Sequence, residues 1–142
     1  MIAPDTSIVV AALAPWHVTH EQARAALAVD RTALVAHVAV ETTSALSRMP
    51  ERQRIAPGVV LSALRSAFTG AWLSLPGNGV QEALERAASA GVRGGALYDA
   101  LIAATAAAHG ATLITADRRA SVSYEAMGAA FTLVHQGHGS GS

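Results

Sequence analysis

The chain has 142 residues, a formal net charge of zero from ten basic and ten acidic residues, and no cysteine. Hydrophobic residues make up 51% of the chain, which is enough to bury the core of one domain and excludes a disordered segment. The lack of cysteine excludes a disulfide framework, an iron–sulfur cluster and cysteine-ligated zinc. Neutral charge provides no broad basic field, so a nucleic acid would have to bind at a local site.

Every basic residue is an arginine, and the chain contains no lysine. This excludes mechanisms that depend on a P-loop lysine, on a Schiff base or on the lysine of receiver-type phosphoacceptor domains. No apolar run approaches the roughly 18 residues of a membrane span. We therefore expect a cytoplasmic protein that makes no contact with a membrane.

Short apolar segments alternate with helical segments along the whole chain. The predicted strands are 1–5, 33–36, 71–75, 111–115 and 131–134. The predicted helices are 8–13 (N-capped by Thr6 and Ser7), 20–29, 41–48, 57–68, 81–90, 97–109 and 118–127. This alternation predicts an α/β domain over 1–134, with a mostly parallel sheet of four to five strands between two layers of helices. The Gly- and Ser-rich segment 135–142 is predicted to be a disordered tail.

Acidic residues fall where predicted strands give way to helices. Asp5 ends the first strand, and Asp117 follows the strand at 112–115 by two residues. Glu41 is expected to open the helix after the second strand, and Asp99 lies in the first turn of an apolar helix. Because the carboxyl ends of parallel strands share one edge of the sheet, these four carboxylates are expected to converge there.

Each acid on its own has a simpler explanation, since a carboxylate in the first turn of a helix interacts well with the helix dipole and can cap the helix. Asp99 is harder to explain in this way, because a carboxylate within an apolar helix is costly without a partner. Four clustered carboxylates repel one another unless a cation lies among them. The pattern therefore favours a site for a hard divalent ion with oxygen ligands.

Four segments carry a resemblance to a known family. The segments 5–7, 37–50, 94–105 and 115–120 resemble, in this order, the four acidic motifs of PIN-domain ribonucleases, and most of all those of VapC toxins from bacterial toxin–antitoxin pairs. The resemblance covers residues 1–134. It implies a PIN-like fold and a Mg²⁺- or Mn²⁺-dependent endoribonuclease. It also implies inhibition by a VapB-type antitoxin, an RNA substrate and a homodimer.

The resemblance also implies roles for individual residues. The catalytic acids would be Asp5, Glu41, Asp99 and Asp117, and the metal ligands would be Asp5, Asp99 and Asp117. Thr6 and Thr115 would support these acids.

Arg118 and Arg119 stand where many relatives carry a further acid, so the resemblance leaves open whether the site holds one metal ion or two. Arginines beside an acidic edge could instead hold RNA phosphates in a bidentate manner. The same residues are also compatible with ordinary solvated charge.

Two other functions remain open from the sequence. A haloacid-dehalogenase-like phosphatase also begins with an aspartate after its first strand, but it needs a second acid two residues later, where this chain has Ser7. A catalytically inactive PIN-like binding module is the second alternative.

A predicted partner surface lies on the helices within 8–29 and 41–68. An apolar groove there could hold an amphipathic antitoxin helix, with Trp16 and Trp72 as candidate anchors. An arginine of the partner could bind the acidic edge.

Overall fold

A small parallel sheet lies at the centre of the computed structural model, which describes residues 1–29 and 31–135. The three strands are β1 (Ile2–Pro4), β2 (Thr112–Thr115) and β3 (Phe131–Leu133), in the order β1-β2-β3. The middle strand therefore comes from late in the chain and joins its N-terminal strand to its last one. Of the predicted tail at 135–142, only the first residue falls within the described part of the chain.

The two other predicted strands, 33–36 and 71–75, are reduced to single bridges. Thr32 forms a parallel bridge with Ile2, and Val35 forms one with Leu73. The first segment cannot lengthen its ladder, because the chain turns into a helix directly after Val35. The described residues thus contain three strands with continuous ladders, where the sequence predicts four to five, while the α/β class and the parallel order are confirmed.

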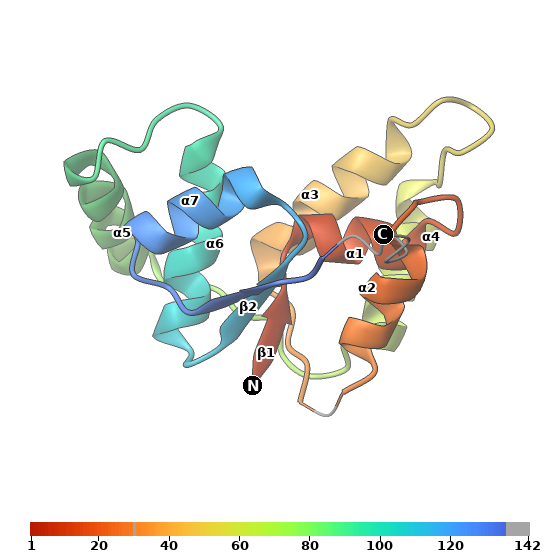
Figure 1. The fold of residues 1–142 in the computed structure, drawn as a ribbon, viewed down its shortest axis with the longest axis horizontal. Helices are drawn as coiled ribbons and strands as arrows, with labels where there is room; N and C mark the ends of the chain where they lie inside the picture. The colour runs from red at the N-terminus through yellow and green to blue at the C-terminus, as the bar shows by residue number, and fades with distance from the viewer. Residues whose placement is uncertain (30, 136–142) are drawn as a thin grey trace, which may run out of the picture.

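The helices form two groups on either side of the sheet. They are α1 (Thr6–Leu13), α2 (His20–Leu27), α3 (Ala36–Ser47), α4 (Pro57–Ala67), α5 (Gly77–Ser89), α6 (Ala96–Ala108) and α7 (Arg118–Ala126). Figure 1 shows α1 to α4 to the right of the strands and α5 to α7 to the left, which gives the three-layer arrangement that the alternating pattern predicts. None of the described helices is long and apolar enough to cross a membrane.

Three helices begin well before their predicted starts: α1 at Thr6, α3 at Ala36 and α5 at Gly77, where the sequence predicts 8, 41 and 81. The N-cap of α1 is Asp5, whose carboxylate accepts a hydrogen bond from Ile8 N, and not Thr6 or Ser7. The helix α3 begins at Ala36, so Glu41 lies in its second turn and does not open it. The apolar residues before Glu41 fit a buried strand as well as a buried helix, and periodicity alone does not separate the two over so short a run.

The core is built largely from small side chains around β2 and α6. The helix α6 packs against α5, α7 and β2, which confirms that it is buried on more than one side. Its buried residues are Ala100, Ile102, Ala103, Ala104, Thr105 and Ala106. Alanine on these faces lets the helix backbone approach its neighbours closely, so the few large side chains of the core, such as Leu113, carry much of the buried apolar area.

Leu113→Ala should destabilise the protein by about 2–5 kcal/mol, because Leu113 is fully buried in the middle strand and its loss leaves a cavity. The control is Leu84→Ala on α5, where the side chain is 48% exposed and the cost should be about 1 kcal/mol or less. Chemical denaturation of both variants measures the difference. Equal costs at the two positions would contradict this description of the core.

Candidate active site

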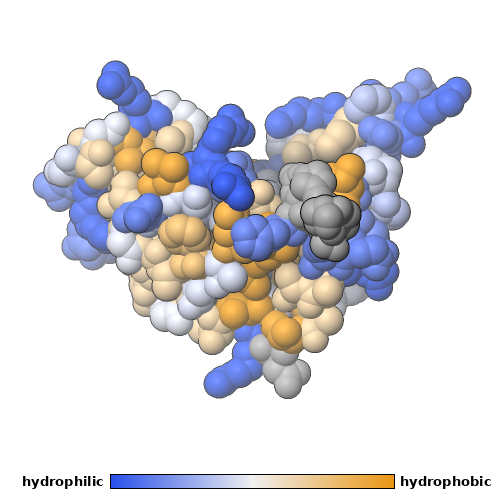
Figure 2. Space-filling view, in the orientation of Figure 1, coloured by the Kyte–Doolittle hydropathy of each residue, from blue (hydrophilic) through white to orange (hydrophobic). Residues whose placement is uncertain are grey.

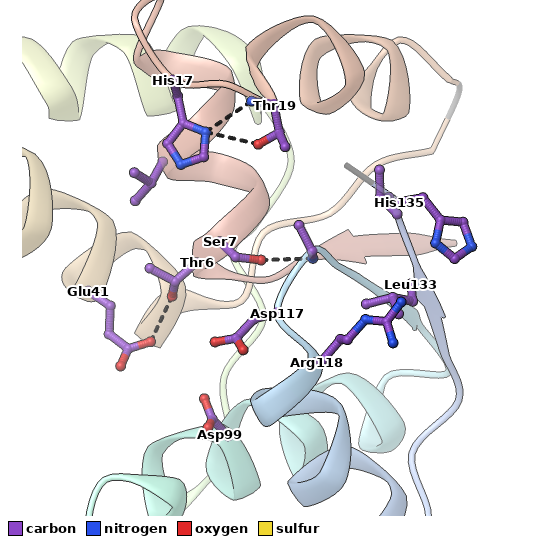
Figure 3. Close-up of a pocket in the computed structure, with 13 residues that line it drawn as sticks. Thr6, Ser7, His17, Thr19, Glu41, Asp99, Asp117, Arg118, Leu133 and His135 are labelled. Atoms are coloured by element: carbon purple, nitrogen blue, oxygen red, sulfur yellow. Dashed lines mark hydrogen bonds between the residues drawn. The ribbon is translucent and has the colours of Figure 1, made fainter. Parts of the chain in front are cut away.

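A cleft of about 890 Å³ opens at the end of the sheet where the strands give way to helices. Figure 2 shows the molecule hollowed between its two groups of helices on this side. Glu41 from α3, Asp99 from α6 and Asp117 at the start of α7 line the cleft, and Figure 3 shows their carboxylates facing a common space. Three of the four predicted acids are thus brought together from three separate elements.

The fourth acid, Asp5, lies behind the cleft and is almost fully buried, with 2% of its surface exposed. Its Oδ1 accepts hydrogen bonds from Ser7 Oγ (2.5 Å) and Ile8 N (3.3 Å), and its Oδ2 accepts one from Tyr124 Oη (2.7 Å). Burial raises the pKa of Asp5, and these hydrogen bonds partly oppose that rise. The three donors therefore compensate a carboxylate whose ionised form would otherwise be costly to bury.

Hydroxyl groups hold the chain around β2 in place. Ser7 Oγ accepts a hydrogen bond from Ala116 N (2.9 Å), and Thr115 Oγ1 accepts one from Asp117 N (3.0 Å). The Asp117 carboxylate in turn caps α7, because its Oδ1 accepts a hydrogen bond from Arg119 N (2.9 Å). The orientation of Asp117 is thus fixed both by the end of β2 and by the start of α7.

Glu41 is held from the opposite side of the cleft. Thr6 Oγ1 donates a hydrogen bond of 2.7 Å to Glu41 Oε1, which links the first turn of α1 to α3. The second oxygen, Oε2, lies 3.8 Å from His37 Nε2, one helical turn earlier in α3. Both side chains are partly buried, at 25% exposure for His37 and 30% for Glu41.

Asp99 has the most perturbed environment of the acids that line the cleft. Burial raises its pKa, and the charges of Glu41, Asp117 and Asp5 raise it further, to about 6. The charge of Arg119 opposes this rise only in part. The other three acids are therefore close enough to Asp99 to raise its pKa, although they come from segments far apart in the chain.

The donor set of the cleft is chemically suited to a hard divalent cation. Such ions prefer carboxylate oxygens and retain some water ligands. The neighbouring carboxylates here raise the cost of ionising Asp99, and a bound cation would offset that cost. As the side chains stand in the described part of the chain, no three His, Asp or Glu residues lie close enough to enclose an ion. Binding would require side-chain rotations of the acids that line the open cleft, Glu41, Asp99 and Asp117.

The two arginines differ in their position. Arg118 lines the cleft, whereas the Arg119 side chain is 94% exposed and its Nε lies 3.8 Å from Asp117 Oδ1. Positive charge is therefore present on one wall of an otherwise acidic cleft, next to Asp117.

Comparison with known proteins identifies the family of the chain. The family model described as PIN domain matches residues 2–124. The chain belongs to the PIN-domain family. It is 46% identical over 126 residues to Ribonuclease VapC40 of Mycobacterium tuberculosis, covering 88% of this chain and 92% of that protein. It is 37% identical over 127 residues to Ribonuclease VapC27 of the same species, covering 89% of this chain and 92% of that protein. The predicted resemblance to VapC-type proteins is thus confirmed.

Solved structures support the PIN fold at lower sequence identity. The structure of FitAB bound to an IR36 DNA fragment is similar with a TM-score of 0.71 and 20% identity, covering 94% of both chains. The crystal structure of FitAcB from Neisseria gonorrhoeae has a TM-score of 0.66 and 21% identity, covering 92% of this chain and 96% of that one. At this level of identity the likeness concerns the fold alone.

Sequence reasoning missed two contributors to this PIN-domain site. Tyr124 donates to Asp5 across 119 residues of chain, and no local pattern signals such a contact. Ser7 has a clearer signal, since a small hydroxyl residue two positions after an acid at a helix start can bond that acid. From the sequence, Ser7 is expected to cap the first helix and is not expected to bond Asp5.

Asp99→Asn should raise the melting temperature of this PIN-domain protein at pH 7.5 by about 3 °C or more, measured in a chelating buffer. The wild-type carboxylate has a folded-state pKa of about 6, above its ordinary 3.8, so its ionisation destabilises the fold above pH 6. This penalty fades as the pH falls through 6 and is gone below 3.8, where both states are protonated.

The gain from Asp99→Asn should therefore shrink between pH 7 and pH 4. The control is Glu85→Gln on α5, where the side chain is exposed and no comparable gain is expected. A gain that does not depend on pH, or a loss of stability at pH 7.5, would contradict the repulsion among the acids.

Proposed function

We propose that this PIN-domain protein is a Mg²⁺- or Mn²⁺-dependent endoribonuclease that acts as the toxin of a toxin–antitoxin pair. The observation that carries the proposal is the meeting of Glu41, Asp99 and Asp117 in one cleft, with Asp5 buried behind them. Two relatives that align with nearly nine-tenths of the chain are named Ribonuclease VapC, which supports RNA as the substrate. The resemblance adds a cytoplasmic location and a homodimer to the proposal.

The proposed reaction is the attack of a water molecule on the scissile phosphodiester of RNA. A divalent ion held by Asp5, Asp99 and Asp117 would supply positive charge to a phosphate oxygen and acidify the attacking water. Glu41 lies on the facing wall, where its carboxylate can accept a proton from water while Thr6 holds it in position. Because water and not the ribose 2′-hydroxyl attacks, the products carry a 5′-phosphate and a 3′-hydroxyl.

The side chains around these acids have supporting roles in the proposal. Thr115 fixes the backbone at Asp117, so that this carboxylate faces the cleft. Arg118 lines the cleft and the exposed Arg119 lies close to Asp117, where guanidinium groups can bind the phosphates that flank the cleavage site. These arginines would supply the local positive charge that a protein of zero net charge needs in order to bind RNA.

The proposed partner is a VapB-type antitoxin. The cleft is acidic at one end, while Val10, Leu133 and Val134 line it elsewhere, so an amphipathic segment with an arginine matches its chemistry. Trp16 is 41% exposed between α1 and α2, as an anchor residue would require. Trp72 is partly buried and lines a separate hollow with Phe68, so the structure favours Trp16 of the two candidate anchors.

The purified chain should cleave single-stranded RNA in the presence of Mg²⁺ or Mn²⁺, and a chelator should abolish the cleavage reversibly. Asp99→Asn should lower kcat by at least about a hundredfold, because the variant removes a charge from the reacting centre without changing its shape. Sequencing of the 5′-phosphate ends in total RNA after expression would identify the target.

Glu85→Gln serves as the matched control, since it removes a carboxylate from an exposed face of α5. RNA cleavage by Asp99→Asn at the wild-type rate would overturn the assignment of the site. Metal-dependent hydrolysis of a small phosphomonoester without any cleavage of RNA would favour the phosphatase alternative, and no hydrolysis of either would favour an inactive binding module.

Expression of the chain alone should arrest bacterial growth, and co-expression with the neighbouring open reading frame should restore growth and yield a co-purified complex. Asp99→Asn is the control, because it should permit growth by itself and still bind the antitoxin. A folded wild-type chain that is harmless and captures no neighbour would contradict the toxin role, even if RNA cleavage is observed in vitro.

A further inference from the structure

His37 and Tyr98 form an aromatic pair beside the acidic cleft. Their rings are stacked, with centroids 5.3 Å apart and planes inclined by 5°. His37 lies in the first turn of α3 and Tyr98 in the first turn of α6. The stack therefore joins the helix that carries Glu41 to the helix that carries Asp99.

The two helices have few other means of fixing their separation. The helix α3 packs mainly against α1 and α4, whereas α6 packs mainly against α5 and α7, so each belongs to a different group. Figure 1 shows these groups on opposite sides of the strands. Since Glu41 and Asp99 must act on the same phosphodiester in the proposed function, a direct link between α3 and α6 affects the geometry of the reaction.

The free edge of the His37 ring also faces Glu41. The Nε2 atom of His37 is buried and has no hydrogen-bond partner among the described residues, although it lies only 3.8 Å from Glu41 Oε2. A buried polar nitrogen without a hydrogen-bond partner destabilises the fold. A small movement of the flexible Glu41 side chain would bring Oε2 within hydrogen-bond distance of Nε2–H, while Thr6 holds Oε1.

We propose that His37 is a positioning residue that orients the Glu41 carboxylate, with its ring plane fixed by the stack on Tyr98. This proposal rests on the proposed ribonuclease function and extends it to two residues outside the acidic set. His37 contacts neither the phosphodiester nor the ion. It acts through Glu41, which keeps one oxygen bound to Thr6 and the other directed by the imidazole, with its remaining lone pairs facing the cleft.

The central test is the kinetics of RNA cleavage by two variants of His37. His37→Phe keeps an aromatic ring for the stack but removes the nitrogen, and kcat should fall about tenfold or more with an unchanged KM. His37→Gln restores an N–H donor and should recover part of the lost kcat. Such rescue is not expected if the ring only contributes to packing.

The matched control is His109→Phe. His109 lies at the other end of α6, is exposed, and donates from Nε2 to Ser74 O at 2.9 Å, so this variant loses a comparable hydrogen bond far from the acids. It should alter thermal stability without altering kcat. Wild-type kcat in His37→Phe, a change confined to its melting temperature, or a rise in KM in place of the fall in kcat would each overturn the proposal.

A second measurement does not depend on RNA cleavage. In the NMR spectrum, the ring protons of His37 should be shifted upfield by the ring current of Tyr98, and Tyr98→Leu should remove this shift. Random-coil shifts in the wild-type chain would overturn the positioning role whatever the nuclease assay shows. A stacked His37 in a folded chain that cleaves no RNA would overturn the proposed function first, and the role of His37 with it.

Discussion

The buried carboxylate of Asp5 is the constraint on which the rest of the site depends. It lies at the end of β1, caps α1, and accepts hydrogen bonds from Ser7 and from Tyr124 of α7. A carboxylate at this depth is tolerated only with several donors, so its neighbours must fold around it in one arrangement. In consequence, the first strand, the first helix and the last helix meet at one point, directly behind the cleft.

The same arrangement brings the acids together, and their mutual repulsion lowers the stability of the fold. The fold brings Asp99 close enough to Glu41, Asp117 and Asp5 for its pKa to rise to about 6, and it places few positive charges nearby to offset the repulsion. This repulsion lowers the stability of the fold at one edge of the sheet. Such a cost is typical of sites that bind a charged ligand. The core of closely packed alanine-rich helices around β2 supplies the stability that this edge lacks.

The two groups of helices divide the site between them. Glu41 and Thr6 belong to one group, whereas Asp99 and Asp117 belong to the other, so the width of the cleft depends on how the groups are joined. The sheet joins them at its base, and the ring stack between His37 and Tyr98 joins them near the acids. Any ligand that contacts both walls therefore depends on this second, smaller link for its fit.

The sequence by itself determined the elements that local patterns report. The alternation of apolar and helical segments predicted the parallel α/β class, the positions of Asp5 and Asp117 at strand ends and the buried helix around Asp99. The absence of lysine excluded the mechanisms that depend on a lysine side chain. Only the tertiary structure decided that α3 starts at Ala36, that two predicted strands shrink to bridges, and that Tyr124 bonds Asp5. The physical reason is range: hydrophobic periodicity reflects neighbours along the chain, whereas a donor 119 residues away and the length of a ladder depend on how distant segments pack.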